Sequence, residues 1–453
     1  MQFEFATASR ILFGNGVSLQ LPSIAASMGR RPLVVIGRSR DRAAPLLDRL
    51  HAQNLVVTLF HIPQEPTVDL VYEGVKRARE TQCDMVVGIG GGSAMDAGKA
   101  IAALIANPGD IFDYLEVIGH GKPLGNLPLS YIAVPTTAGT GAEVTRNAVL
   151  ASPQHRVKVS LRSPLMLPNL AIVDPLLTHD LPPQVTAGTG LDALTQLIEA
   201  FACAYANPLT DGICREGIRF GAPSLIRAVE AGHDATAREN MSLASLFGGL
   251  ALANAKLGAV HGIAGPLGGM ISAPHGALCG RLLPYVTEKN IVALRDRAPQ
   301  APQLARYDEV ARMVTDDPRA EAEQGAVWMH NLCEKLRIPT LGELGLAEAD
   351  IPKACESALR SSSMKGNPVE LTRHEVTDIL YQALEPQGCI NNEVKLTAFA
   401  LAPKLMSMKA LPLTADVNRN DMAAVGFTLR PNSMSPDPGR WSKIRAFIAY
   451  AFF

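Results

Sequence analysis

The chain has 453 residues, of which 47% are hydrophobic and 19% charged, and its formal net charge is −1. A chain of this length can form about two or three domains and bury a large core. The near-neutral charge gives no electrostatic reason to expect nucleic acid or an anionic membrane as a partner, and we expect neither. The N-terminus lacks the pattern of a signal peptide, and no stretch reaches the ~20 apolar residues of a membrane span.

The seven cysteines are scattered along the sequence and form no CxxC pair. An odd number of scattered cysteines is typical of a reducing compartment and not of a disulfide framework. We therefore expect a cytoplasmic protein.

Three parts follow one another along the chain. Residues 1–178 alternate short apolar runs, such as 32–37 and 84–90, with amphipathic segments, a pattern that predicts a parallel sheet covered by helices. Residues 179–384 carry long segments of 3.6-residue period, which predict an all-helical domain. Residues 385–453 have no sustained period and are punctuated by prolines. We interpret them as a poorly ordered extension, with a small appended module as the alternative.

A glycine-rich turn, GGGS at residues 90–93, leads from a predicted strand into a predicted helix. Backbone N–H groups at such a turn can approach a phosphate, and the helix dipole favours the anion. Ser93 suits the N-cap of the helix, and Asp96 falls in the capping-box position. A tight turn with an ordinary cap is the alternative, but the strand–turn–helix context favours phosphate binding. The spacing is not GxGxxG, so this is not the ordinary Rossmann fingerprint.

A second polar turn, PTTAGTGAEVT at residues 135–145, follows another apolar run. It offers the hydroxyl groups of Thr136, Thr137 and Thr140 and the exposed N–H of Gly139. The carboxyl ends of parallel strands meet at one edge of a sheet, where α/β folds bind ligands. We therefore expect the two turns to lie together there.

Four side chains in the second part form a candidate metal site. Asp192 and Gln196 are four residues apart in a predicted helix, so both project from one face. His261 and His275 are separated by a segment with enough glycine and proline to turn the chain. One aspartate with two histidines suits Fe(II) or Zn(II), which could polarise an alcohol or carbonyl oxygen. Each residue alone is more simply a buried imidazole or a solvated carboxylate, and only the combination indicates a metal.

Taken together, these residues resemble the iron-containing alcohol dehydrogenase family. The resemblance covers nearly all of residues 5–384, and several separated motifs occur in the family's order. They are FGNG at 13–16, GGGSAMDAGK at 90–99, PTTAGTGAEVT, the aspartate of LAIVDP, GLDALTQLIEA, HG…PHG at 261–276 and SSSMKGNPVELTRHEV at 361–376.

The resemblance implies an N-terminal dinucleotide-binding α/β domain (1–178), an all-α metal and substrate domain (179–384), and an active site in the cleft between them. This is a dehydroquinate-synthase-like architecture. It implies NAD- or NADP-dependent hydride transfer between a nicotinamide and a metal-bound alcohol or aldehyde, and we expect a homodimer or higher homo-oligomer. The implied metal ligands and catalytic residues are Asp192, His261 and His275, with Gln196 as a doubtful fourth ligand. The implied cofactor-binding residues are Gly37, Ser39, Gly90, Gly91, Gly92, Ser93, Asp96, Thr136, Thr137, Thr140 and Lys158.

The chain departs from the family pattern in three places. Gln196 stands where the family has a fourth histidine ligand, and a neutral amide oxygen is a poorer donor to Fe(II) or Zn(II). Gly265 stands where many members carry a histidine near the nicotinamide, which excludes a proton relay through that position. Gly37 replaces the acidic residue that holds an NAD ribose, and Arg38 and Arg40 follow it. NADP is therefore an alternative to NAD, and solvated surface arginines are the other interpretation.

Two other functions stay open. A metal-independent reductase of the maleylacetate reductase type could use the same fold without a metal at Asp192. A non-catalytic ligand-binding protein could have kept the fold alone. Metal dependence separates the first alternative from a metal-dependent dehydrogenase, and dinucleotide binding separates the second.

Overall fold

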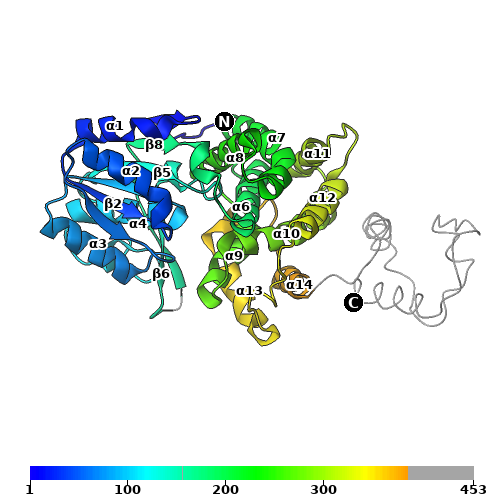
Figure 1. The fold of residues 1–453 in the computed structure, drawn as a ribbon. Helices are drawn as coiled ribbons and strands as arrows, with labels where there is room; N and C mark the ends of the chain where they lie inside the picture. Colours follow the sequence, from blue (N-terminus) through cyan, green and yellow to red (C-terminus); the bar gives the residue numbers. More distant parts are fainter. Residues whose placement is uncertain (156, 386–453) are drawn as a thin grey trace, which may run out of the picture. The chain divides into compact units, whose positions relative to one another are not determined.

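A computed structural model of the chain describes residues 1–155 and 157–385 (Figure 1). The described residues all belong to one compact unit. Apart from residue 385, the predicted extension over 385–453 lies outside them, and so does Cys389.

A parallel sheet of six strands forms the core of the N-terminal part, as predicted, with the strand order β1-β8-β5-β4-β2-β3. Its strands are β1 (Ile11–Phe13), β2 (Pro32–Ile36), β3 (Thr58–His61), β4 (Met85–Gly90), β5 (Ser130–Pro135) and β8 (Leu170–Val173). The helices of this part are α1 (Leu21–Met28), α2 (Arg40–Ala52), α3 (Val68–Glu80), α4 (Gly92–Ala106) and α5 (Ile111–Tyr114). A separate antiparallel pair consists of β6 (Asn147–Ser152) and β7 (Val157–Arg162).

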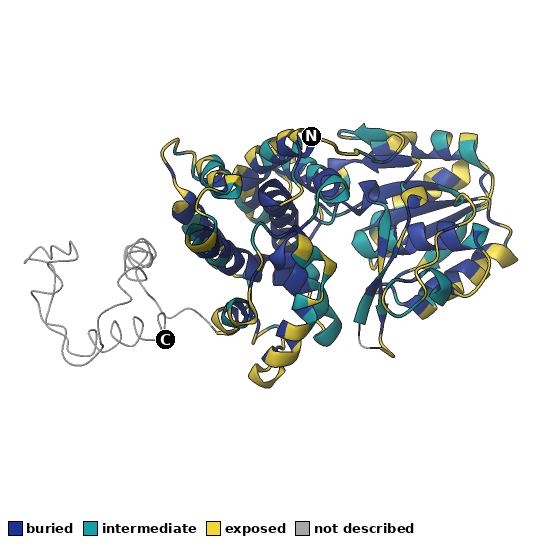
Figure 2. Cartoon of the chain, turned by 180° about the vertical axis from the view of Figure 1, so that it is seen from behind, coloured by how far each residue is buried: buried dark blue, intermediate teal, exposed yellow. Residues whose placement is uncertain are grey.

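The central strands are apolar on both faces because helices cover both. Val34 and Ile36 of β2 pack with α1 and α2, whereas the alternate residues Leu33 and Val35 pack with α3 and α4. Figure 2 shows the strands and the inner helices in the dark blue of buried residues.

The strand order creates a crevice between β2 and β4. The chain passes from β2 outward to β3 and then returns to place β4 on the other side of β2. The connections that follow β2 and β4 therefore diverge, and their carboxyl ends border the crevice in which such sheets bind ligands.

Helices make up the second part, as predicted, and α6 is its central element. From residue 190 onward every residue of α6 is buried, and α6 packs against α7, α8 and α10. Among the helices in the described part, none alone is long and apolar enough to cross a membrane, although the pair α8 and α9, bent by 96°, passes on length and composition. The helices are α6 (Pro183–Ala202), α7 (Pro208–Glu230), α8 (Ala235–Asn254), α9 (Ala259–Met270), α10 (His275–Arg297), α11 (Pro302–Thr315), α12 (Ala322–Lys335), α13 (Ile351–Leu359) and α14 (Arg373–Leu384).

The second polar turn joins the two parts through close backbone contacts. A Cβ at Gly249 of α8 would lie 2.3 Å from the carbonyl oxygen of Gly141, so glycine is required for this approach. Gly141 also has a φ of +58°, a conformation that favours glycine. A Cβ at Gly139 would lie 2.7 Å from the Cβ of Thr189 on α6. The turn after β5 therefore lies directly against α6 and α8.

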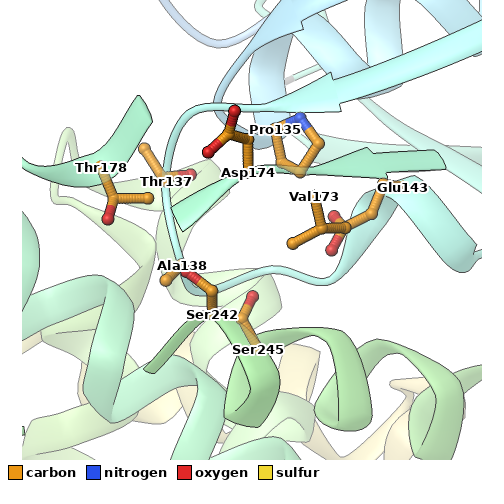
Figure 3. Close-up of a pocket in the computed structure, with 9 residues that line it drawn as sticks. All are labelled: Pro135, Thr137, Ala138, Glu143, Val173, Asp174, Thr178, Ser242 and Ser245. Atoms are coloured by element: carbon orange, nitrogen blue, oxygen red, sulfur yellow. The ribbon is translucent and has the colours of Figure 1, made fainter. Parts of the chain in front are cut away.

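A narrow pocket lies between this turn and α8, and a buried carboxyl lines it (Figure 3). Glu143, in the short helix Ala142–Val144, is only 2% exposed and shares the pocket with Ser242 and Ser245 of α8. Burial raises the pKa of Glu143 to about 7. The junction of the two parts therefore contains a carboxyl that is protonated in mildly acidic solution.

The raised pKa of Glu143 predicts a loss of stability at alkaline pH. The folded protein holds the proton of the Glu143 carboxyl more tightly than the unfolded chain does. The stability that this proton contributes is therefore fully present below the unfolded-state pKa of Glu143 and is lost as the pH rises through about 7. Glu143→Gln cannot titrate. The free energy of unfolding of the wild type relative to this variant should therefore fall by roughly 2 kcal/mol between about pH 5.5 and pH 8.5.

Denaturant unfolding at both pH values measures this difference. Glu73→Gln, at an exposed position of α3, is the control and should behave as the wild type. An identical pH dependence in the wild type and Glu143→Gln would contradict the prediction.

Candidate active site

The two polar turns lie side by side at the carboxyl edge of the sheet, as predicted. Gly90 is the register partner of Pro135, and the N–H of Thr136 donates to the carbonyl of Gly90 at 2.8 Å. A Cβ at Gly92 would lie 2.8 Å from the methyl group of Thr140, and one at Gly91 would lie 3.2 Å from Thr137. Glycine is needed in the first turn because the threonines of the second turn cover it.

Helix α4 begins directly at the glycine turn. Its N-cap is Gly91, so the predicted cap at Ser93 is wrong by two residues. The reason is that the carbonyl of Gly91 already accepts from the N–H groups of Ala94 and Met95, at 3.0 and 3.1 Å, which starts the helix without a side-chain cap. The N–H groups of the first turn are left for an anion, as at other helix starts.

Gly37 and Ser39 lie at the same edge, at the end of β2. The N–H of Gly37 donates to the carbonyl of Ile89 at 3.1 Å, and a Cβ at Gly37 would lie 3.6 Å from the Cα of Gly90. This position therefore borders the crevice, and a Cβ fits there in ordinary van der Waals contact with the glycine turn. Ser39 is the N-cap of α2 but makes no side-chain cap bond, and Arg38 and Arg40 on either side of it are exposed.

Asp96 and Lys158 are held by the β6–β7 pair. The carboxylate of Asp96 accepts from the N–H of Val149 at 3.0 Å and pairs with Lys99 at 3.1 Å. Lys158 of β7 pairs with Glu65 at 2.6 Å, and its Nζ would lie 2.7 Å from a Cβ at Gly268 of α9. Lys158 is thus at the border of the α/β and helical parts.

Three helices bring the predicted metal ligands together. Asp192 comes from α6, His261 from α9 and His275 from the first turn of α10. Asp192 Oδ1 lies 3.2 Å from His261 Nε2 and 4.0 Å from His275 Nε2. Asp192 and His261 are buried, whereas the His275 side chain is 34% exposed and so forms the accessible side of the cluster.

Cys279 joins this cluster and was not predicted. Its Sγ lies 3.5 Å from His275 Nε2 and 3.7 Å from His261 Nε2. One donor atom from each of these residues and Asp192 lies within 4.8 Å of all the others. The signal in the sequence is the spacing of four residues between His275 and Cys279, which places both on one helix face.

The side chains of the cluster shift one another's pKa values toward the charged forms: anionic Asp192 and Cys279 beside a protonated His261. Burial disfavours the charged form of His261, but Cys279, Asp192 and Glu199 outweigh it and raise the pKa of His261 well above its ordinary value. Burial at Cys279 is outweighed by the two imidazoles, which lower the pKa of the thiol. The pKa of Asp192 is also lowered against its burial, mainly by its hydrogen bond with His261.

Glu199 orients His261 and was also missed. His261 Nδ1 donates to Glu199 Oε2 at 2.6 Å, and the N–H of Val260 donates to Glu199 Oε1 at 2.6 Å. Glu199 holds the proton of Nδ1, so Nε2, which lies 3.2 Å from Asp192 Oδ1, is the ring nitrogen that faces the cluster. The signal in the sequence is that Glu199 follows Asp192 by seven residues, on the same face of α6.

Gln196 connects the donor cluster to the second polar turn, at Thr140. Its Nε2 donates to Asp192 Oδ1 at 3.2 Å and to the carbonyl of Thr140 at 3.3 Å. Its Oε1 is buried without a hydrogen-bond partner in the described part of the chain and would lie 2.9 Å from a Cβ at Gly248. The reverse amide orientation would place Oε1 against two acceptors, so the amide nitrogen must face Asp192 and Thr140.

Gly265 lies one helical turn after His261 in α9, and no side chain fills this position. A Cβ there would meet no atom within 4 Å. The side chain that many family members carry at this position is therefore replaced by open space.

Comparison with known proteins gives the same family over residues 8–175 and 186–384. The models of the families "Iron-containing alcohol dehydrogenase" and "Fe-containing alcohol dehydrogenase family, C-terminal" match residues 8–175 and 186–384. The 1,3-propanediol dehydrogenase of Klebsiella pneumoniae is 34% identical over 389 residues, which cover 84% of this chain and 98% of that protein. Alcohol dehydrogenase 4 of Schizosaccharomyces pombe is 35% identical, with 82% and 87% covered.

A solved structure agrees in fold. The sulfoacetaldehyde reductase from Bifidobacterium kashiwanohense, in complex with NAD+, has a TM-score of 0.74 and 30% identity, and the match covers 85% of this chain and 100% of that one. The predicted fold class and the predicted oxidoreductase class, an alcohol dehydrogenase or aldehyde reductase, are confirmed. The chain belongs to the iron-containing alcohol dehydrogenase family.

Proposed function

We propose that this chain interconverts short primary alcohols and their aldehydes with NAD or NADP, using a divalent metal held by Asp192, His261 and His275. The observation that carries the proposal is the adjacency of two sites. The donor atoms converge within 4.8 Å, and Gln196 links them directly to the cofactor turn at Thr140. A ligand-binding protein without catalysis would not require this link.

In this proposal the α/β part of the chain binds the dinucleotide along the carboxyl edge of its sheet. The first turn of α4 holds the pyrophosphate through its N–H groups. The sulfoacetaldehyde reductase that shares the fold is in complex with NAD+, which supports a nicotinamide dinucleotide in this chain. The residues proposed for this site are Gly37, Ser39, Gly90, Gly91, Gly92, Ser93, Asp96, Thr136, Thr137, Thr140 and Lys158.

The donor set fits a divalent cation. A carboxylate and two imidazoles suit Fe(II) or Zn(II), and their donor atoms lie within 4.8 Å of one another. When bound, such a cation supplies Lewis-acid polarisation of the substrate oxygen. Glu199 keeps the lone pair of His261 directed at the site, and the partly exposed His275 marks the side from which substrate enters.

Gly265 supplies no side chain for a proton relay, so the proton of the alcohol would pass directly to solvent. A Cβ at Gly265, one helical turn beyond His261, would meet no atom within 4 Å. The named relatives act on propanediol and on alcohols, and their small size supports a short primary alcohol here.

We also propose a location, an assembly and a domain boundary for this chain. All six cysteines in the described ranges are free thiols, which supports the cytoplasm. We keep the homodimer or higher homo-oligomer expected for such an enzyme, and the domain boundary between residues 178 and 179.

The activity itself is tested with short primary alcohols and either dinucleotide. Protein reconstituted with Fe(II) or Zn(II) should form reduced nicotinamide, and chelation should abolish the reaction. Asp192→Ala should lower kcat/KM by about three orders of magnitude or more, because Lewis-acid polarisation is worth several kcal/mol. Full activity of Asp192→Ala without metal would instead support a metal-independent reductase.

Glu199→Gln should weaken metal binding while the fold persists. The amide keeps an acceptor for the N–H of Val260 but removes the charged partner of His261 Nδ1. Loss of such a supporting partner typically costs about 10–100-fold in metal affinity, and calorimetric titration of the apoprotein with Zn(II) measures it.

Glu288→Gln is the matched control because it alters a similar carboxylate–imidazole pair, with His330 at 2.9 Å, outside the cluster. Equal affinities in the wild type and Glu199→Gln would remove Glu199 from the site.

Gly37→Asp should change the cofactor preference. A Cβ fits at this position without a clash, and a carboxylate there would bind an NAD ribose but repel the 2′-phosphate of NADP. The ratio of kcat/KM for NAD to that for NADP should rise by about tenfold or more, since like charges at an interface cost several kcal/mol.

Gly212→Asp introduces the same charge on the exposed side of α7, where a side chain meets nothing within 4 Å. It should leave the ratio unchanged. An unchanged ratio in Gly37→Asp as well would show that the end of β2 does not contact the ribose.

A further inference from the structure

We propose that Cys279 is the fourth protein ligand of the metal site, and that the resulting Asp–His–His–Cys set selects Zn(II) over Fe(II). This rests on the proposed function, in which Asp192, His261 and His275 hold a divalent metal. The sequence predicted Gln196 as a doubtful fourth ligand, and we assign that role to Cys279 instead.

The helix geometry places Cys279 beside a ligand. His275 and Cys279 are one turn apart on α10, so their side chains project from one face. Cys279 is completely buried, and its Sγ lies between the Nε2 atoms of His275 and His261, at 3.5 and 3.7 Å. A cysteine that served only as a small apolar side chain would have no reason to direct its sulfur at two imidazole nitrogens.

The distances match the edges of a tetrahedron around zinc. Metal–nitrogen bonds of about 2.0–2.1 Å and a metal–sulfur bond of about 2.3 Å imply nitrogen–sulfur edges of about 3.5–3.6 Å. The two observed edges are 3.5 and 3.7 Å. The same bond lengths imply oxygen–nitrogen edges of about 3.3 Å, and Asp192 Oδ1 lies 3.2 and 4.0 Å from the two imidazoles. Three of these four distances match an edge, and Asp192 Oδ1 would have to approach His275 Nε2 for the set to surround one ion.

The side chain of Gln196 is held in place by two hydrogen bonds that do not involve a metal. Its amide nitrogen donates to Asp192 and to the carbonyl of Thr140, and its oxygen lies on the side of Gly248. Rotation of the amide to offer its oxygen to the metal would break both hydrogen bonds. Gln196 therefore orients Asp192, and Cys279 completes the donor set.

The charge and softness of the set favour zinc. One carboxylate and one thiolate neutralise a divalent cation, so the ion and its ligands are buried without net charge. Thiolate is a soft ligand and is typical of zinc sites, whereas a set of imidazoles and a carboxylate suits Fe(II) equally well. A substrate oxygen would have to approach the site from the side of His275, because Asp192, His261 and Cys279 are buried.

Cobalt(II) tests the ligand directly, without any measurement of activity. Full-length apoprotein is titrated with Co(II) under anaerobic conditions while its absorption spectrum is recorded. The wild type should develop an intense near-ultraviolet thiolate-to-cobalt charge-transfer band that saturates at one equivalent. Cys279→Ser should lose this band, and its affinity for Zn(II) should fall by more than the ~100-fold upper range for loss of a mere supporting partner.

Two further variants show whether the loss of the band is specific to Cys279 and whether another ligand can restore metal binding. Cys214→Ser, at an equally buried cysteine in the apolar core of α7, should keep the band. The double variant Cys279→Ser with Gln196→His supplies an imidazole from α6 and should recover metal binding, without the charge-transfer band. The preference for Zn(II) over Fe(II), measured by competition, should be lower in both variants that lack Cys279 than in the wild type.

The outcomes separate this inference from the function on which it rests. Stoichiometric cobalt binding to the wild type without a charge-transfer band would overturn the role of Cys279 and leave the metal site standing. Retention of the band in Cys279→Ser would overturn it too. If the wild type bound no cobalt or zinc at all, both the inference and the metal-dependent function would fail.

Discussion

The buried amide of Gln196 is the contact on which the geometry of the site depends. It donates to the carboxylate of Asp192 and to the carbonyl of Thr140, so one side chain spans the metal cluster and the cofactor turn. The glycine contacts of the same turn with α6 and α8 fix the backbone on both sides of this link. The distance between the turn after β5 and the donor cluster is therefore set by packed backbone.

Helix α6 has its polar residues where a core helix would be apolar. Asp192, Gln196 and Glu199 are all buried on one face of α6, which packs against α7, α8, α10 and α11. Buried polar groups are costly unless each has a partner, and here Asp192 faces two imidazoles while Glu199 accepts from His261 and Val260. The face is stable as a network, and the network leaves a position for one cation.

The sequence was sufficient to predict what depends on local pattern. Apolar runs indicated the parallel strands, and the turns after β4 and β5 met because the ends of parallel strands share an edge. Cys279 and Glu199 were missed because their role depends on how α6, α9 and α10 pack, although their spacing from His275 and Asp192 was visible. The start of α4 was misplaced because the carbonyl of Gly91, and not a side chain, begins that helix.

X-ray absorption at the zinc edge of the reconstituted protein shows whether one ion is held by Asp192, His261, His275 and Cys279 beside the turn after β5. We expect one sulfur at about 2.3 Å and nitrogen or oxygen neighbours at about 2.0–2.2 Å, with imidazole scattering beyond them. The sulfur contribution should vanish in Cys279→Ser. A first shell of nitrogen and oxygen alone in the wild type, or a shell of several sulfurs, would contradict the account.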